Sequence, residues 1–322
     1  MGGLFPILMS VGSVSGIAVI SRPILKMKGW GGSVLSGATA GLVLVLGPLL
    51  IPPERVMTRA LVSLGSADLF FKLVDYAREN RRGGGGRWGD YLRFLVPLPV
   101  FLVVFRNRGR RPPTPVPTRP EIVRVLVGTA VASACVAEVI AGGGVAVSAS
   151  FALNHMFRLA VFVVTIEAAS EAMGGLERLA GFDIRPIIRS CFLARTPLEF
   201  WSRYNTRVHS WFESNLFRPM GGRRAPIRAV LATFFVSAVF HELMFDLALS
   251  SVDGSQFAFF MIQAPAVLAS PRLERFARRS GFAGDALARS LTIAWMSASS
   301  ILFFRGVSRI FPFLDANPSG LR

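Results

Sequence analysis

Charged residues are scarce in this chain. Only 17% of its 322 residues are Asp, Glu, Lys or Arg, and 52% are hydrophobic, whereas soluble domains carry about 25% charged residues. This composition argues strongly against a water-soluble protein of this size. Cys135 and Cys191 give no disulfide or metal-binding pattern. The sequence also lacks His-Glu-x-x-His and Gly-x-Ser-x-Gly, so metal hydrolysis and a serine nucleophile have no support and we expect no bound metal.

The scarce charges are strongly biased toward the positive sign. Lys and Arg number 36 against 19 Asp and Glu, for a net charge of +17, which in a soluble chain would indicate nucleic-acid binding. Here the apolar stretches between the basic clusters are too long for such a domain, and basic loops beside apolar helices are typical of membrane proteins. We therefore expect an integral, multi-pass membrane protein without a nucleic-acid partner. Its membrane would be the endoplasmic reticulum in a eukaryote or the cytoplasmic membrane in a bacterium.

A spanning helix needs about 20 mostly apolar residues. Windows of this character predict about eight spans, at 4–20, 34–51, 60–74, 122–141, 151–170, 226–249, 257–269 and 291–304. The run 94–105 is short and contains two prolines, which indicates a re-entrant or interfacial segment. The basic, proline-rich residues 106–120 predict a solvated linker. The predicted fold class is an all-α polytopic membrane protein, with one domain over 1–322 whose helices surround an intramembrane reaction chamber.

The distribution of Lys and Arg is consistent with this order of spans. With the N-terminus outside, the basic clusters at 22–28, 78–119, 178–224 and 272–279 all fall on the inside, provided that 94–105 does not cross. Eight crossings then place both termini outside. Charged residues within or beside the windows, such as Asp68 and Glu167, indicate an interior lined with polar groups.

Two of the three histidines lie in apolar windows. His241 follows about 15 apolar-helix residues, where a charged group costs roughly 2.5–3.5 kcal/mol to insert, so it is expected to face a polar cavity. The alternative is a neutral histidine hydrogen-bonded between helices. His155, beside Asn154 and one turn before Arg158, is interpreted as part of a polar cluster at the membrane boundary.

The third histidine, His209, lies in an aromatic and basic segment at 200–212. Aromatic rings alternate there with arginines, as in a helix that lies at the membrane interface. In a helix, Asn205 and His209 would be one turn apart and share a face. Interfacial anchoring explains the rings and arginines but not the carboxamide of Asn205, although a lone Asn is usually a cap or a turn.

Residues 197–246 resemble the membrane-bound O-acyltransferase family, and within it the lipid branch of wax synthases and sterol and diacylglycerol acyltransferases. The residues that carry the resemblance are Phe200-Trp201, Asn205, Val208-His209, Trp211, the run 217–222, and Ser237 to Glu242 with the His-Glu pair. Asn205 and His241 stand 36 positions apart. The family commonly has Trp before the Asn, where this chain has Tyr204. The chain's length is closer to the wax synthases.

The resemblance implies transfer of an acyl group from acyl-CoA to the hydroxyl of a lipophilic alcohol, as in wax ester synthesis, with no tightly bound cofactor. A buried neutral histidine is suited to remove the proton of a hydroxyl, so His241 is the candidate general base. The family role of Asn205 is to hold the acyl carbonyl or its developing oxyanion. Candidate substrate-binding residues are His209, Trp201, Trp211, Arg218, Arg223 and Glu242. Expected partners are acyl-CoA, a hydrophobic alcohol and membrane lipids.

Two other classes remain open from the sequence. Intramembrane ionisable residues could form a proton or solute pathway in a transporter, with His241, Glu242, Asp246, Asp68 and Glu138 as its members. No internal repeat supports that interpretation. A third possibility is a lipid-binding family member that has lost catalysis, which would not need to keep Asn205 and His241.

Overall fold

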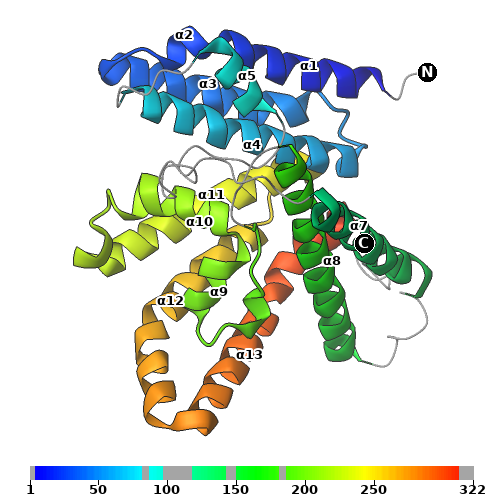
Figure 1. The fold of residues 1–322 in the computed structure, drawn as a ribbon, viewed down its shortest axis with the longest axis vertical. Coiled ribbons are helices and arrows are strands. Elements are labelled where there is room, and N and C mark those ends of the chain that lie inside the picture. The colour runs from blue at the N-terminus through cyan, green and yellow to red at the C-terminus, as the bar shows by residue number, and fades with distance from the viewer. Residues whose placement is uncertain (1–3, 82–86, 97–117, 143–149, 181–185, 312–322) are drawn as a thin grey trace. The chain divides into compact units, whose positions relative to one another are not determined.

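The computed structural model describes residues 4–81, 87–96, 118–142, 150–180 and 186–311, and all regular structure within these ranges is helical (Figure 1). The all-α prediction is thereby confirmed. The chain divides into two compact units, Met1–Arg110 with Glu242–Asp253, and Arg111–His241 with Gly254–Arg322. A single domain over 1–322 and a central reaction chamber stay predictions. The proposed re-entrant run beyond residue 96 and linker residues 106–117 lie outside the described residues, and residues 118–120 begin a helix instead of ending the linker.

The first unit is built on three long helices, α1 (Phe5–Ile20), α3 (Gly29–Leu49) and α4 (Val56–Arg81), with the short α2 (Arg22–Leu25) and α5 (Trp88–Leu95). α3 packs along α4, and α1 contacts both (Figure 1). Tyr76 and Tyr91 lie in its core with ring centroids 4.5 Å apart, and the Tyr91 hydroxyl donates to the carbonyl of Ala18 at 2.5 Å. The run expected to be re-entrant therefore begins inside α5, where Phe94 is a core residue.

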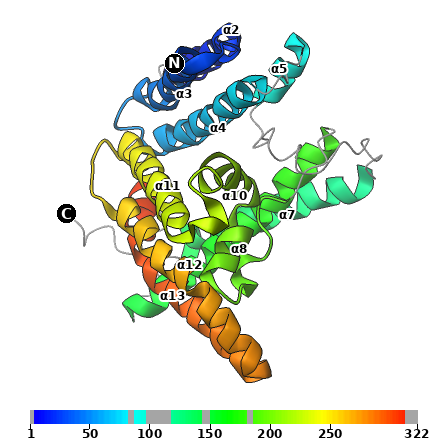
Figure 2. The same ribbon diagram turned by 90° about the vertical axis from the view of Figure 1, so that its left-hand side faces the viewer.

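The second unit contains two long helical pairs and the segment between them. α7 (Thr118–Gly142) packs on α8 (Phe151–Leu179), and α12 (Ser255–Arg279) packs on α13 (Gly281–Ile310). In Figure 1 and Figure 2 the two helices of each pair lie side by side. Gly128 and Gly175 let α7 and α8 approach closely, because a Cβ at either position would come within 2.6–2.7 Å of the other helix.

The connecting segment runs as short helices from residue 191 to 224. It comprises the 3-10 turn η1 (Cys191–Leu193), α9 (Pro197–Tyr204), α10 (Thr206–Phe212), the π-helix η2 (Glu213–Phe217) and the 3-10 turn η3 (Gly222–Arg224). In η2 the Arg218 amide donates to the Glu213 carbonyl at 3.0 Å, the five-residue spacing of a π-helix. The long α11 (Pro226–Leu249) follows, and the division between the two units falls after His241.

Each of the eight predicted windows coincides with a helix, and only the windows 4–20 and 34–51 extend one or two residues beyond it. Among the described residues, five helices are long and apolar enough to cross a membrane: α3, α7, α8, α11 and α13. α1, with 16 residues, is shorter. α12 is less apolar because of buried glutamines that bond to α13: Gln263 donates to Ser299 Oγ at 3.0 Å and accepts from Trp295 Nε1 at 3.0 Å. α4 carries buried charges, including Lys72 paired with Asp68 at 2.9 Å. Gln263 of α12 and Lys72 of α4, which interrupt the hydropathy of these helices, are thus held by protein partners.

Candidate functional site

His241 lies on the face of α11 that packs against α12. Its Nδ1 is 2.8 Å from the Ser237 carbonyl oxygen, which can only accept, so Nδ1 carries the proton. The imidazole stacks on Phe260 of α12, with ring centroids 3.9 Å apart and an interplanar angle of 29°. Nε2 has no hydrogen-bond partner among the described residues. The ring is therefore fixed with an unprotonated nitrogen as a free acceptor.

Trp201 joins α9 to the helices that hold His241. Its ring contacts Phe234 of α11 and Phe260 of α12, at centroid distances of 5.8 and 5.6 Å. Phe234 and Phe260 belong to a hydrophobic cluster of the second unit, and Trp201 packs against it. The indole Nε1 is buried without a hydrogen-bond partner in the described part of the chain. α9 is thus packed, four residues before Asn205, on the ring that stacks on His241.

Asn205 lies between α9 and α10, with an extended backbone (φ −141°, ψ 86°). Its Oδ1 accepts from the Val208 amide at 3.1 Å and caps α10. Its carbonyl accepts from the His209 amide at 2.8 Å. Within the described ranges, Nδ2 makes no hydrogen bond to the protein. The cap fixes the orientation of the carboxamide and leaves its two N–H groups available.

The two residues after Asn205 hold it in place. Thr206 donates through its amide to the Ile187 carbonyl at 2.8 Å and through Oγ1 to the Pro186 carbonyl at 2.6 Å. Arg207 forms a two-pronged ion pair with Glu177 at the end of α8, and the side chains are 1% and 0% exposed. The turn at Asn205 is therefore fixed from both the preceding loop and α8.

His209 and Trp211 lie on α10 after the cap. The segment at 200–212 is two helices broken at Asn205, and the predicted spacing of Asn205 and His209 by one turn is retained through their backbone hydrogen bond. Burial lowers the pKa of His209, and the charge of Glu213 offsets part of that shift. The Trp211 ring is buried and packs edge-on against Phe212.

The predicted cationic residues differ in their surroundings. Arg218 is paired with Glu213 at 2.8 Å, with both side chains exposed. Arg223 is exposed and makes no ion pair or side-chain hydrogen bond with the described residues. Between them Gly221 (φ 104°) and Gly222 (φ 53°) adopt left-handed conformations that favour glycine. Arg223 is thus the freer of the two for an anionic ligand.

Glu242 follows His241 on α11 and points about 100° away from it around the helix. It belongs to the first unit, whereas His241 belongs to the second. In the described residues, no group of three or more His, Cys, Asp or Glu side chains could hold a metal ion.

The sequence assigns no role at the site to three residues that the structure places there, Ser237, Glu177 and Phe260. Ser237 stands four residues before His241, and this helical spacing could have identified its carbonyl as the partner of the ring. Glu177 is separated from Arg207 by 30 positions, and Phe260 lies on another helix. No local signal identifies either of them.

The described residues form an all-helical integral membrane fold, with a half-buried histidine and a capped asparagine in the second unit. Residues 145–283 match the membrane-bound O-acyltransferase family. This range contains both Asn205 and His241, and the match confirms the resemblance found in the motifs. A segment of 106 residues is 33% identical to diacylglycerol O-acyltransferase 1C of Glycine max and 32% identical to diacylglycerol O-acyltransferase 1 of Corylus americana. In both comparisons it covers 33% of this chain but only 20% of the relative. The chain thus matches about a fifth of the length of these relatives.

Proposed function

We propose that the protein transfers an acyl group from acyl-CoA to the hydroxyl of a lipophilic alcohol, forming a wax ester or a related ester. The observation that carries the proposal is the fixed tautomer of His241. Its Nδ1 proton is held by the Ser237 carbonyl, so Nε2 can accept a proton. The family match and the similarity to two diacylglycerol O-acyltransferases support the reaction class.

In the proposed reaction, His241 is the general base. As Nε2 removes the hydroxyl proton of the alcohol, the alcohol oxygen attacks the thioester carbonyl carbon. A carbon–oxygen bond forms and the carbon–sulfur bond breaks. Nε2 then transfers the proton that it took from the alcohol to the leaving thiolate. The products are the ester and CoA. Phe260 contributes by stacking on the imidazole and holding its orientation.

Asn205 is the proposed donor to the acyl carbonyl. Its Oδ1 is engaged by the Val208 amide, so the N–H groups of Nδ2 are directed away from the cap. Such a donor strengthens its hydrogen bond as negative charge develops on the carbonyl oxygen, and its removal costs about 10²–10³ in kcat in other enzymes. Trp201 and the α10 residues His209 and Trp211 are proposed to line the substrate site, and Arg223 to contact the donor's phosphates.

The test is a CoA-release assay on purified protein in lipid nanodiscs. Acyl-CoA donors of increasing chain length are paired with long-chain alcohols, sterols and diacylglycerol. His241→Ala should lower kcat by about 10²–10⁴, whereas His155→Gln, a matched histidine replacement in α8, should stay within about threefold of wild type. Absence of CoA release with every pair would overturn the acyltransferase function, and equal turnover by His241→Ala would overturn the assigned base.

Two substitutions of Asn205 distinguish its role as the cap of α10 from its proposed role as a hydrogen-bond donor to the acyl carbonyl. Asn205→Asp keeps an oxygen for the Val208 amide but has no N–H donor, so kcat should fall by about 10²–10³ with unchanged thermal stability. Asn205→Ser also keeps a capping oxygen and should show a similar loss. Full activity in Asn205→Asp would contradict the donor role.

A further inference from the structure

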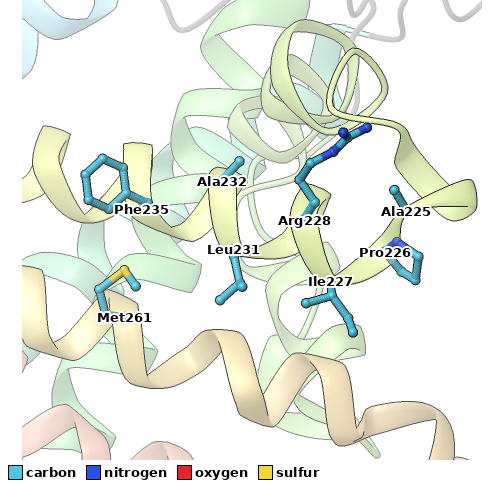
Figure 3. Close-up of a pocket in the computed structure, with 8 residues that line it drawn as sticks. All are labelled: Ala225, Pro226, Ile227, Arg228, Leu231, Ala232, Phe235 and Met261. Atoms are coloured by element: carbon cyan, nitrogen blue, oxygen red, sulfur yellow. The ribbon is translucent and has the colours of Figure 1, made fainter.

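A groove of about 830 Å³ lies along the first half of α11, beside α12. Its lining is Ala225, Pro226, Ile227, Arg228, Leu231, Ala232, Phe235 and Met261. In Figure 3, Ile227 and Leu231 project from α11 toward α12, and Met261 reaches from α12 toward Phe235. Arg228 is the only charged residue in this lining. The volume lies in the range of known ligand sites, about 300–1,000 Å³.

The groove is open to the surroundings of the second unit. Ile227, Leu231 and Phe235 are 63%, 41% and 50% exposed, and they lie on a helix that is long and apolar enough to span a membrane. Apolar side chains at such positions contact lipid chains. From Arg228 to Phe235 the helix rises about 10 Å, which is shorter than the roughly 15 Å of one leaflet's hydrocarbon. The groove is therefore short enough to lie within one leaflet of the bilayer.

Positive charge is concentrated at the N-terminal end of the groove. Arg228 is anchored there because its Nε donates to the Met220 carbonyl at 2.8 Å, and its guanidinium turns toward that loop (Figure 3). Its remaining N–H groups have no acceptor among the described residues. Arg224, directly before the first lining residue, is exposed and has no ion pair in the described ranges. Two cationic groups are thus available where the apolar lining begins.

The groove lies before His241 along α11. At 1.5 Å per residue, Ile227, Leu231 and Phe235 precede His241 by about 21, 15 and 9 Å along the helix axis, and at 100° per residue they lie about 40°, 80° and 120° from it around the helix. His241 is turned toward Phe260 within the packed cluster, whereas Leu231 and Phe235 are exposed. A chain lying in the groove would therefore pass outside the packed face that holds the proposed base. This separates the groove from the proposed reaction site.

We propose that the groove binds an anionic phospholipid. The headgroup phosphate lies at Arg224 and Arg228, and one acyl chain lies on Ile227, Leu231, Phe235 and Met261. Basic pockets beside membrane helices on the cytoplasmic side attract anionic lipids, and the Lys and Arg distribution predicts that this end of α11 is on the inside. A zwitterionic lipid has the same phosphate but also brings an ammonium group close to both guanidinium groups, whereas an anionic lipid does not.

The test compares bound lipids by native mass spectrometry after reconstitution in nanodiscs. Phosphatidylglycerol and phosphatidylcholine with identical acyl chains compete for the full chain. Each arginine near the membrane surface contributes a factor of about five to anionic-lipid binding. The preference for phosphatidylglycerol should therefore fall about 25-fold in Arg224→Gln/Arg228→Gln. Arg275→Gln/Arg279→Gln, which removes the same charge from α12, should leave it unchanged.

A second variant tests the apolar part of the groove with both arginines intact. Leu231→Trp fills the groove at an exposed position and should reduce phosphatidylglycerol occupancy at least fivefold, whereas Leu291→Trp at a similarly exposed position of α13 should not. Glycerol 3-phosphate, which has the headgroup charge but no chains, should not displace the lipid. Palmitoyl-CoA should not displace it at concentrations that saturate the enzyme.

Several results would overturn the proposal. These are equal binding of the two lipids by wild type, an equal loss in the α12 control, or displacement by glycerol 3-phosphate alone. Displacement by palmitoyl-CoA with the same sensitivity to Arg224 and Arg228 would assign the groove to the acyl donor instead. Because the readout is lipid binding, its failure is distinguishable from failure of the acyltransferase function.

Discussion

The buried ion pair of Glu177 and Arg207 is expected to control the order of α10. Both side chains are almost fully buried, at 0% and 1% exposure, and they join the end of α8 to the residue two positions after Asn205. Removing one partner of a buried pair costs about 3–5 kcal/mol, because the other charge is left without compensation. A guanidinium cannot lose its charge, whereas a carboxylate can take up a proton. Glu177→Leu should therefore be more damaging than Arg207→Met.

The assay is hydrogen exchange of the α10 amides at residues 208–212 in detergent micelles, which reports the free energy of local opening. Glu177→Leu should accelerate their exchange on the order of a hundredfold to a thousandfold, the equivalent of about 3–5 kcal/mol. The double variant Glu177→Leu/Arg207→Met replaces the pair by apolar groups and should recover most of the protection. The exposed pair Glu274–Arg278 serves as the control, and its rupture should cost less than about 1 kcal/mol.

Two results would refute this reasoning. One is exchange in Glu177→Leu within fivefold of wild type, which would mean that the pair contributes little to the order of α10. The other is a double variant as disordered as the single variant. In that case the loss would come from packing volume and not from an uncompensated charge.

Two further predictions concern titratable groups of the connecting segment. Because burial lowers the pKa of His209 below its usual 6.5, the unfolded state binds its proton at a higher pH than the folded state. The stability of wild type should fall relative to His209→Gln as the pH drops from about 6.5 through the lowered pKa, and parallel melting-temperature profiles of the two proteins between pH 7.5 and 5 would contradict this. Burial, with a smaller effect of Glu167, raises the pKa of Cys191 to about 12, and its side chain is 1% exposed. In a Cys135→Ser background, a membrane-permeant maleimide at pH 8 should therefore label Cys191 only after unfolding, and rapid labelling of the native protein would show that the thiol is accessible.

The helices were predictable because hydropathy reports burial in lipid, and each apolar window coincides with a helix to within two residues. The positions of the helix ends were less predictable. α4 continues to Arg81 and α12 to Arg279, since charged residues can extend a helix beyond its apolar part. α13 begins at Gly281, ten residues before the apolar window that predicted it.

The site was predictable only where its information is local. The motif residues Asn205 and His241 follow from sequence spacing, and helix capping is the usual role of a lone Asn. The structure gives Asn205 that capping role through Oδ1 while leaving Nδ2 available. The contacts of Arg207 with Glu177 and of His241 with Phe260 depend on how separate helices pack, so no spacing rule predicts them.

The π-helix of Glu213–Phe217 has a consequence for how this segment tolerates changes in length. A π-turn contains one residue more than an α-helical turn of equal hydrogen bonding, and the wider turn brings the Arg218 amide to the Glu213 carbonyl. In a continuous α-helix one additional residue would rotate everything after it by about 100°, whereas the wider π-turn takes up that residue locally. Among related sequences, a one-residue gap at this point would therefore mark a regular α-helical turn in place of the π-turn, with Arg218 kept on nearly the same side of the segment.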